Sequence, residues 1–256
     1  MPKVPDIAQQ VDALDISLFA AIPSQTTAPD RRMLLAVQRA TARKHGSYVY
    51  LEIGSHLGGS LQPHVLDSRC AKIYSIDPRP AMQPDDRSPG YVHRYEGNST
   101  PRMLDLLREL ERGDTAKIEC FDKDAEAICP GEIGRRPHIA FIDGEHTKEA
   151  VLRDYRFCAQ VLAGDGAILF HDFNFIYPAI MEIRADLEAQ RRPHDVLRLD
   201  GSLCAIFFDT GFVASDVLLA EVHTRNRHYL DSIHFRLFRW RKALKRHFAS
   251  RRMKAP

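Results

Sequence analysis

The sequence of 256 residues predicts an α/β protein built on an open, mostly parallel sheet. Short runs of β-branched and aromatic residues alternate along the chain with segments of helical periodicity. The first five runs are almost continuously apolar, as is typical of parallel strands buried on both faces. The last two are separated only by Gly201 and Ser202, a connection that is too short for a parallel crossover and fits a hairpin. We therefore expect seven strands with an antiparallel hairpin at the edge of the sheet.

The strands are expected in regular order, and a segment that can be helical follows each of the first five. Asp30 is a candidate N-cap for a helix over 31–44. Thr147 is a candidate N-cap for a helix that ends near residue 162. The predicted strands cover 48–54, 72–77, 116–121, 138–143, 166–172, 195–200 and 203–208.

Three regions follow from this order of elements. Residues 1–29, rich in Pro, Ala and Thr, are expected to form an N-terminal extension with one short helix around 7–20. The α/β domain is expected over 30–212. A C-terminal helical extension with a basic amphipathic tail is expected over 213–256.

The composition is that of an ordinary globular domain, with 44% hydrophobic and 27% charged residues and a mean hydropathy of −0.32. This balance excludes a mainly disordered or fibrous chain. No apolar run approaches the ~20 residues of a membrane-spanning helix, and the first residues lack the pattern of a secretory signal. We therefore expect a cytoplasmic protein whose five cysteines form neither a disulfide framework nor a zinc site.

The charge is unevenly distributed along the chain. The formal net charge is +2, but the 25 residues after Asp231 carry nine Lys or Arg and no acid, which leaves the rest at −7. Within 233–248, apolar side chains recur at helical spacing and basic residues occupy the other positions. Such a helix either lies in an anionic membrane interface or packs its stripe on this chain or a partner subunit. The stripe consists of Ile233, Leu237, Trp240, Leu244 and Phe248.

A glycine-rich loop follows the first expected strand at 54–60. Glycines let the backbone turn sharply and approach a ligand closely, as in nucleotide-type sites. The loop lacks the GxGxxG pattern of pyrophosphate-binding dehydrogenases, because His56 and Leu57 stand where the second glycine belongs. Glu52 would repel a phosphate but suits a ligand with a cationic amino group, such as S-adenosylmethionine. A nicotinamide cofactor is the alternative that these residues disfavour.

The next two strand ends offer further groups to the same crevice. Asp77 follows the second strand, 23 residues after Gly54, where an acid can accept hydrogen bonds from both ribose hydroxyls. The third strand runs into 121–125, a segment that would line the adenine side. Each loop taken alone could be only a polar strand end, and it is the set of three that favours a cofactor site.

An ordered set of motifs in this chain resembles the class I S-adenosylmethionine-dependent methyltransferases. The likeness is greatest to the branch with the macrolide-sugar O-methyltransferases and the cephalosporin-hydroxylase-like proteins. The motifs, over about residues 48–210, are LEIGSHLGGS, IYSIDP, EGNSTPRMLDLLREL, CFDKDAEAI, HIAFIDGEHTKEAVLRDY and LAGDGAILFHDF. The resemblance implies a Rossmann-like sheet of seven strands with the last strand antiparallel. It also implies that S-adenosylmethionine is bound by Glu52, Gly54, Ser55, Gly58, Asp77, Asp124, Ala125 and Asp143.

Two neighbouring strand ends carry groups for methyl transfer to a hydroxyl. Asp143 and Asp172 can face one another across the crevice, where two carboxylates suit a hard cation such as Mg²⁺. In the metal-using members that the chain resembles, both aspartates match metal ligands and His146 matches the general base. An imidazole has a reference pKa near the operating pH, which supports that role for His146 and makes His171 a second catalytic candidate.

The chain departs from those members at Phe173, where they carry another acid or an amide. His171 or Asn174 replaces the lost ligand, or the protein works without a metal through His146 and His171. In the alternative without a catalytic role, Asp143 only caps the following helix and His171 is a histidine of the core.

The sequence therefore predicts an S-adenosylmethionine-dependent O-methyltransferase that acts on a small hydroxylated acceptor, such as a sugar, a glycolipid or a natural product. The competing hypothesis is a non-catalytic descendant that binds a membrane or a partner through its basic tail. Nucleic acid is not an expected partner, because the chain up to Asp231 is acidic and shows no known nucleic-acid-binding motif. Homo-oligomerisation is left open.

Overall fold

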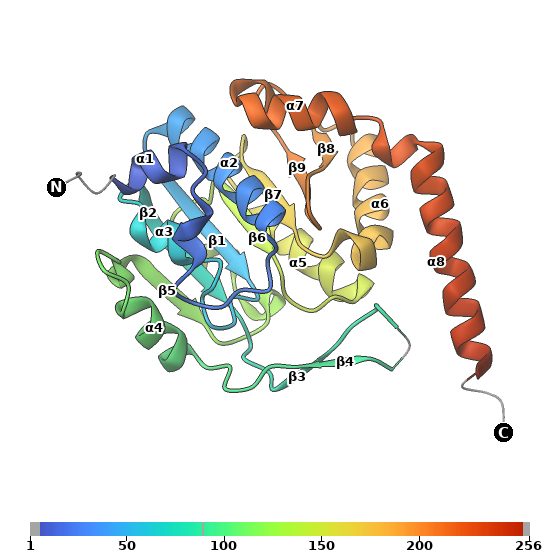
Figure 1. Cartoon of the computed structure of the whole chain (residues 1–256), viewed down its shortest axis with the longest axis horizontal. Coiled ribbons are helices and arrows are strands. Elements are labelled where there is room, and N and C mark those ends of the chain that lie inside the picture. The colour runs from blue at the N-terminus through green and yellow to red at the C-terminus, as the bar shows by residue number, and fades with distance from the viewer. Residues whose placement is uncertain (1–5, 89, 253–256) are drawn as a thin grey trace.

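Seven strands form one sheet in the order β5-β2-β1-β6-β7-β9-β8 in this computed structural model, which describes residues 6–88 and 90–252 (Figure 1). All pairings are parallel except those of β9, which is antiparallel to both β7 and β8. The strands are β1 (Tyr48–Ile53), β2 (Cys70–Ile76), β5 (Ile118–Phe121), β6 (Ile139–Ile142), β7 (Ala167–Phe170), β8 (Asp195–Arg198) and β9 (Cys204–Phe207). The predicted fold is confirmed, with one refinement. The hairpin inserts β9 inside the sheet, so the outermost strand β8 runs parallel to the other five.

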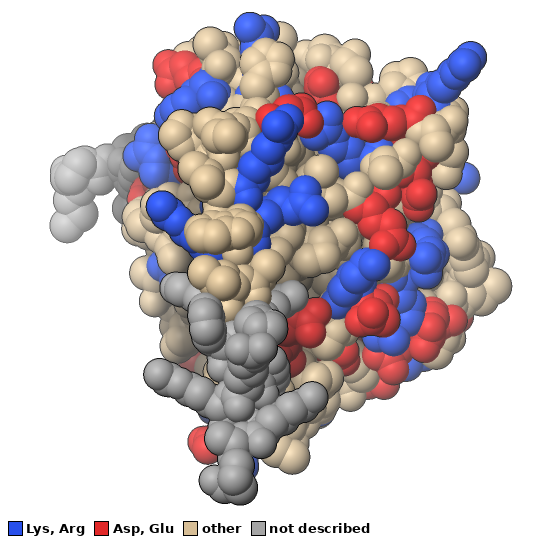
Figure 2. Space-filling view, turned by 90° about the vertical axis from the view of Figure 1, so that its right-hand side faces the viewer, with Lys and Arg blue, Asp and Glu red and all other residues tan. Residues whose placement is uncertain are grey.

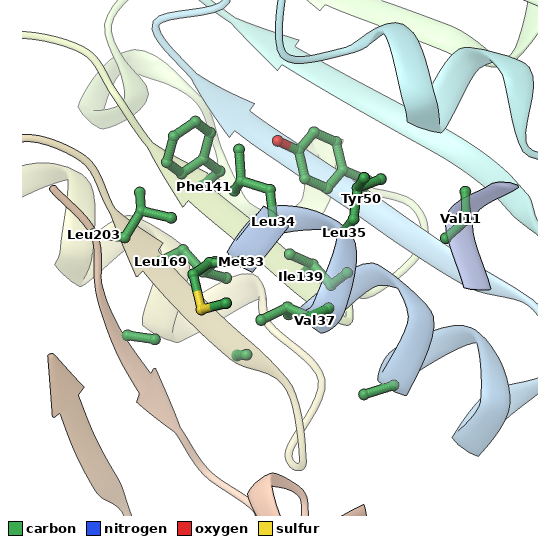
Figure 3. Packing of buried hydrophobic residues seen from close by; sticks show 14 of the residues in the cluster. Val11, Met33, Leu34, Leu35, Val37, Tyr50, Ile139, Phe141, Leu169 and Leu203 are labelled. Carbon is green, nitrogen blue, oxygen red and sulfur yellow. The ribbon is translucent and has the colours of Figure 1, made fainter. Parts of the chain in front are cut away.

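Both faces of the sheet are covered by helices with separate apolar cores. Alternate residues of β1 point to opposite faces, so Tyr50 joins one core and Leu51 the other. Figure 3 shows the first core, where α2 side chains such as Met33 pack over Tyr50, Phe141 and Leu169. The second core lies beneath α5 and α6. The helices are α1 (Ile7–Asp12), α2 (Ala28–His45), α3 (Gln62–Leu66), α4 (Thr100–Arg108), α5 (Lys148–Val161), α6 (Phe173–Ala189), α7 (Val217–Asn226) and α8 (Ile233–Arg252).

The start of α2 differs from the sequence prediction. Thr27, not Asp30, is the N-cap, and its hydroxyl and the Asp30 carboxylate form a capping box. The pattern Thr-Ala-Pro-Asp favours this register, because proline is tolerated in the first helical turn, where its missing N–H costs nothing. The expected boundary between 29 and 30 consequently lies inside α2. The short helix predicted around 7–20 is α1 followed by a 3-10 turn, and Val11 and Phe19 pack into the same core as α2.

The segment between β2 and α4 contains a two-stranded antiparallel ribbon that the sequence did not predict. It consists of β3 (Met82–Pro84) and β4 (Val92–Arg94). Both strands are short and partly exposed, so they carry no apolar alternation that could have revealed them. The ribbon segment is tied to the main domain near His146, where the N–H of Asp86 donates to the carbonyl of His146 and the Asp86 carboxylate accepts from the N–H of Lys148 at 3.1 Å.

Candidate active site

The candidate site lies at the carboxyl ends of β1, β6 and β7, which are neighbours in the sheet. In open α/β sheets ligands bind in the crevice outside these ends. The glycine loop follows β1, Asp143 follows β6, and His171 follows β7. Thr147 is the N-cap of α5, as predicted, and accepts a hydrogen bond from the N–H of Ala150.

The glycine loop touches the backbone that carries Asp143. Gly54 has a φ of +89°, and a Cβ at this position would lie 2.3 Å from the carbonyl oxygen of Asp143. Only glycine fits such an approach in that conformation. Gly58 also has a positive φ and packs on Met103 and Leu107 of α4. The two glycines therefore fix the loop against its neighbours on both sides.

Glu52 is completely buried beneath the loop, and both of its carboxyl oxygens are already bonded. The Tyr50 hydroxyl donates to Oε2 at 2.5 Å and the Ser60 hydroxyl donates to Oε1 at 2.7 Å. Burial raises the pKa of Glu52 to about 8. In this structure Glu52 therefore supports the loop from inside. Ser55, also buried, lies within hydrogen-bond distance of the Ser75 hydroxyl, at 2.9 Å.

Asp77 anchors the same loop through its two oxygens. The N–H of His56 donates to Oδ2 and the N–H of Arg79 donates to Oδ1, each at 2.8 Å. The buried Arg79 guanidinium donates in turn to the carbonyl oxygen of His56 at 2.6 Å. Binding of a ribose by Asp77 would therefore require some of these contacts to rearrange.

The cavity beside the loop is small. It has about 30 Å³ of water-accessible room and is lined in part by Ser24, His56, Tyr95 and Asp143. Ordinary ligand pockets have roughly 300 Å³ or more, so His56 and Tyr95 must move aside before a cofactor of nucleoside size can enter. Asp124 and Ala125, predicted to form the adenine wall, do not line this cavity; Asp124 is exposed and Ala125 is buried in the second core.

Two buried histidines converge on Asp143. Nδ1 of His171 lies 2.9 Å from Oδ1 of Asp143, and Nε2 of His146 lies 3.5 Å from the same oxygen. The backbone holds the pair in place, because the N–H of His171 donates to Ile142 and thereby extends the ladder between β6 and β7. The sequence predicted these three residues together, and the structure brings them into one cluster.

A second carboxylate lies behind each histidine. Oδ2 of Asp85, from the ribbon segment, lies 3.3 Å from Nδ1 of His146. Oδ2 of Asp30, from α2, lies 3.6 Å from Nε2 of His171. Sequence reasoning missed both residues. Asp85 lies in a loop without a motif, and Asp30 had an adequate local explanation as a helix cap.

Asp172 borders the cluster and begins α6 in the left-handed region, with a φ of 52°. Its Oδ2 lies 3.8 Å from Nε2 of His146 and 3.5 Å from the Arg87 guanidinium. Arg87 also pairs with Asp85 at 2.9 Å. This backbone turn points Phe173 into the second core, where its ring packs near Tyr229 and Phe235. Phe173 therefore does not occupy a ligand position.

The charges of the cluster shift every pKa toward the ionised form. Burial opposes the charged imidazolium, but Asp143 and Asp85 outweigh it and raise the pKa of His146 to about 9. The pKa of His171 is raised well above its usual value against the same opposition from burial, chiefly by Asp143. For Asp143, burial is outweighed by His171 and His146, which lower the pKa to about 2. The cluster therefore has a strong affinity for positive charge.

Some buried nitrogen atoms in this cluster lack hydrogen bonds. Within the described part of the chain, neither Nε2 of His146 nor Nε2 of His171 has a hydrogen-bond partner. Buried polar atoms are nearly always paired, so an unpaired one in a polar cluster often marks a position for a ligand, a water or a proton in transit. For His146, the unpaired atom faces Asp143 and Asp172.

The cluster fits a divalent cation. Asp143, His146 and His171 each offer a ligand atom, and these atoms all lie within 4.8 Å of one another. One carboxylate and two imidazoles are donors that suit Mn²⁺, Fe²⁺ or Zn²⁺, whereas Mg²⁺ prefers a shell of oxygen atoms. Asp172, the expected partner of Asp143 as a ligand, is outside this group. The donors present thus favour a transition metal over the expected Mg²⁺.

Comparisons with known proteins identify a methyltransferase family model and similar folds. Residues 51–173 match a family model described as a methyltransferase domain. No curated protein matches the sequence. Among solved structures, the O-methyltransferase NovP is similar with a TM-score of 0.58 and 13% identity, over 79% of this chain and 99% of that one.

MycE, a methyltransferase from the mycinamycin biosynthetic pathway, is also similar. Its structure in complex with Mg, SAH and mycinamycin VI has a TM-score of 0.51 and 13% identity, over 82% of this chain. The chain spans 57% of the length of MycE. At this identity the two solved structures show a shared fold, and the family model places a methyltransferase domain on the segment that carries the loop, Asp77 and the histidine cluster.

Proposed function

We propose that this chain, a class I S-adenosylmethionine-dependent methyltransferase, methylates a hydroxyl group of a small polyhydroxylated acceptor such as a sugar, a glycolipid or a natural product. The observation that carries the proposal is the buried Nε2 of His146, which makes no hydrogen bond within the described residues and faces Asp143 and Asp172, with Asp85 behind the ring. Two carboxylates near this nitrogen, those of Asp143 and Asp172, can accept hydrogen bonds from acceptor hydroxyls. Such a surface favours a neutral polyol over an anionic acceptor.

His146 is the proposed general base. In methyl transfer a lone pair of the acceptor oxygen forms a bond to the methyl carbon while the bond from that carbon to sulfur breaks. The hydroxyl proton passes to Nε2 of His146, which leaves a methyl ether and S-adenosylhomocysteine. Asp85 keeps the proton of the neutral ring on Nδ1 and stabilises the imidazolium that forms, as the aspartate of a catalytic triad does for its histidine.

Asp143 and His171 are the proposed positioning pair. Their 2.9 Å contact fixes the carboxylate of Asp143 toward the cavity that it lines. The backbone of the same residue contacts Gly54 in the cofactor loop. An acceptor hydroxyl bound by Asp143 would therefore be held at a constant distance from the methyl donor, and such orientation is a large part of the rate enhancement of a displacement reaction.

A metal version of the site is the second candidate, and the three converging ligand atoms favour it. Asp143, His146 and His171 would hold the cation. Bound there, a divalent cation polarises an acceptor hydroxyl and lowers its pKa. In this version Nε2 of His146 is a ligand and does not take the proton, so the two versions differ in their dependence on pH.

Calorimetric titration of the purified chain with S-adenosylmethionine and S-adenosylhomocysteine tests the proposal. The titrations are run in EDTA, in Mg²⁺ and in Mn²⁺. Methyl transfer to a panel of sugars and glycosides is then measured under the same conditions. Binding of both cofactors with turnover of a hydroxylated acceptor supports the assignment. Cofactor binding with methyl transfer only to amines or thiols contradicts the acceptor class, and no cofactor binding under any condition contradicts the whole proposal.

A further inference from the structure

The C-terminal helix α8 has two apolar faces, and only one of them is covered. Phe235 is fully buried, and its ring lies 5.9 Å from that of Tyr177 on α6. Phe238 packs on the same tyrosine, and the Lys242 ammonium lies over the ring of Phe175. These three positions form the inner face, which fixes the described start of α8 to α6 at one side of the molecule (Figure 1).

The other apolar face points away from the protein. Its side chains are large and exposed, with exposed fractions of 62% for Ile233, 44% for Leu237, 62% for Trp240 and 40% for Leu244. With ~100° of rotation per residue, this outer stripe lies about half a turn from the inner face. The sequence predicted the stripe but not the direction in which it points. The alternative that the stripe packs on this chain is wrong for these four residues, because their side chains are exposed. Phe248 lies beyond the described side chains.

Basic residues flank the outer stripe on both sides. By the same helical rotation, Arg236 lies along one border and Arg241 along the other, whereas Arg239 lies farther round, over the ring of Phe235; all three are exposed. Figure 2 shows blue side chains beside tan ones on the face that carries α8. The segment 233–252 holds eight Lys or Arg and no acid, and the nearby Asp231 is paired with Arg184 at 2.8 Å.

We propose that α8 lies flat on an anionic lipid bilayer, with the outer stripe inserted among the acyl chains and the flanking arginines at the phosphate headgroups. An apolar stripe with cationic borders is the structure of an interfacial helix. Anionic lipid attracts each basic residue near its surface, whereas a second copy of α8 would bring the same positive charge against it. Within the described residues no helix is long and apolar enough to cross a membrane, so the contact is peripheral.

Sedimentation of the full chain with vesicles tests the proposal. We expect binding to vesicles of phosphatidylcholine and phosphatidylserine in equal parts, weaker binding as salt is raised, and little binding to pure phosphatidylcholine. The double substitution Leu237→Glu with Trp240→Glu should reduce partitioning by about tenfold or more, because it removes two large apolar groups from the interface.

Matched controls separate this surface from general effects of the substitutions. Val217 on α7 is 75% exposed, so Val217→Glu adds an acid at an exposed apolar position outside the stripe. Arg236→Gln with Arg241→Gln tests the borders, against Arg32→Gln on α2. We expect loss only in the α8 variants, with helix content by circular dichroism and S-adenosylmethionine affinity unchanged.

Three results would overturn the inference. The first is no binding of the wild-type chain to the anionic vesicles. The second is equal weakening by Val217→Glu and by the stripe variant. The third is a dimer in analytical ultracentrifugation that the stripe substitutions dissociate, because a second copy would then cover the stripe. The vesicle assay contains no cofactor or acceptor, so its outcome is independent of the proposed methyl transfer.

Discussion

Two clusters of buried polar groups lie side by side at one edge of the sheet, and they differ in how completely their hydrogen bonds are made. Beneath the glycine loop, both oxygens of Glu52 and both oxygens of Asp77 accept bonds from the protein. At the ends of β6 and β7, Nε2 of His146 and Nε2 of His171 have none within the described residues. The first cluster holds a loop in shape, whereas the second keeps unused bonding capacity at a pocket. Nε2 of His56 in the loop also lacks a hydrogen bond within the described residues, so the contrast is between the carboxylates of the first cluster and the imidazoles of the second.

Substitution of His146 should have the largest effect on methyl transfer of all the changes that test this comparison. His146→Gln should lower the rate of methyl transfer by about 10² to 10⁴, the range of a lost general base. S-adenosylmethionine affinity by calorimetry should be unchanged. His138→Gln, at the opposite end of β6, is the matched control, because that histidine accepts a bond from the N–H of Val49 far from the cluster. A rate equal to wild type for His146→Gln would remove the base assignment.

The pH dependence of the rate should be the next largest effect. A base must be neutral to accept a proton, and the pKa of His146 is raised to about 9. The rate in EDTA should therefore rise about tenfold per pH unit up to that pKa and level off above it. Steady-state rates from pH 6 to pH 10 would show this. A flat profile in the presence of bound metal would instead favour the ligand role of His146.

Removal of the charge behind the ring sharpens the comparison further. Asp85→Asn should slow methyl transfer by roughly 10-fold to 100-fold, as is common for groups that orient a catalytic histidine. The carboxylate of Asp85 raises the pKa of His146, so the plateau of the rate should move to lower pH in this variant. A slower enzyme with an unmoved profile would show that Asp85 matters only for folding.

Metal binding tests whether Nε2 of His146 and Nε2 of His171 serve as ligands of a cation. Thermal unfolding without substrate should show a higher midpoint with Mn²⁺ than with Mg²⁺, because two of the three donors are imidazoles. At a Mn²⁺ concentration of about 100 times its dissociation constant, the unfolding midpoint should lie roughly 5–10 °C above that of the metal-free protein. Asp143→Asn should remove most of this increase. Equal stabilisation by both ions, retained in Asp143→Asn, would place the cation elsewhere.

The fully bonded cluster should give the smallest change. Glu52→Gln is nearly isosteric with the neutral acid, and burial raises the pKa of Glu52 to about 8. A raised pKa in the folded state favours folding at low pH, and this contribution is lost as pH rises from the usual glutamate pKa of 4.5 through about 8. Chemical denaturation at several pH values should therefore show that the variant gains on wild type across this window. Parallel curves would contradict the buried state of Glu52.

The sheet, the cap of α5 and the convergence of Asp143, His146 and His171 could be predicted from the sequence, because all depend on local patterns at strand ends. Asp85 and Asp30 could not. Each reaches the cluster from a segment distant in sequence, and each has a complete local explanation of its own, in a turn with Arg87 or in a capping box with Thr27. Local patterns therefore predicted the three residues that converge and missed the carboxylates behind the two histidines.

The outer stripe of α8 shows the same limit in another form. The spacing of its residues predicted the stripe, but the direction in which the stripe points depends on which of two apolar faces of α8 packs on α6. Phe235 and Phe238, outside the expected stripe, take that place and turn Trp240 outward. Periodicity gives the faces of a helix, and only tertiary packing chooses between them.

The close contact between Gly54 and the backbone of Asp143 means that the site has two parts, which differ in how tightly they are held together. The glycine loop, Asp143 and His171 are in direct contact, through the close approach of Gly54 to the Asp143 backbone and the 2.9 Å contact between Asp143 and His171. The ribbon that supplies Asp85 joins this part at few points, and its strands are partly exposed. A change in the ribbon can therefore alter the surroundings of His146 without moving the glycine loop or Asp143.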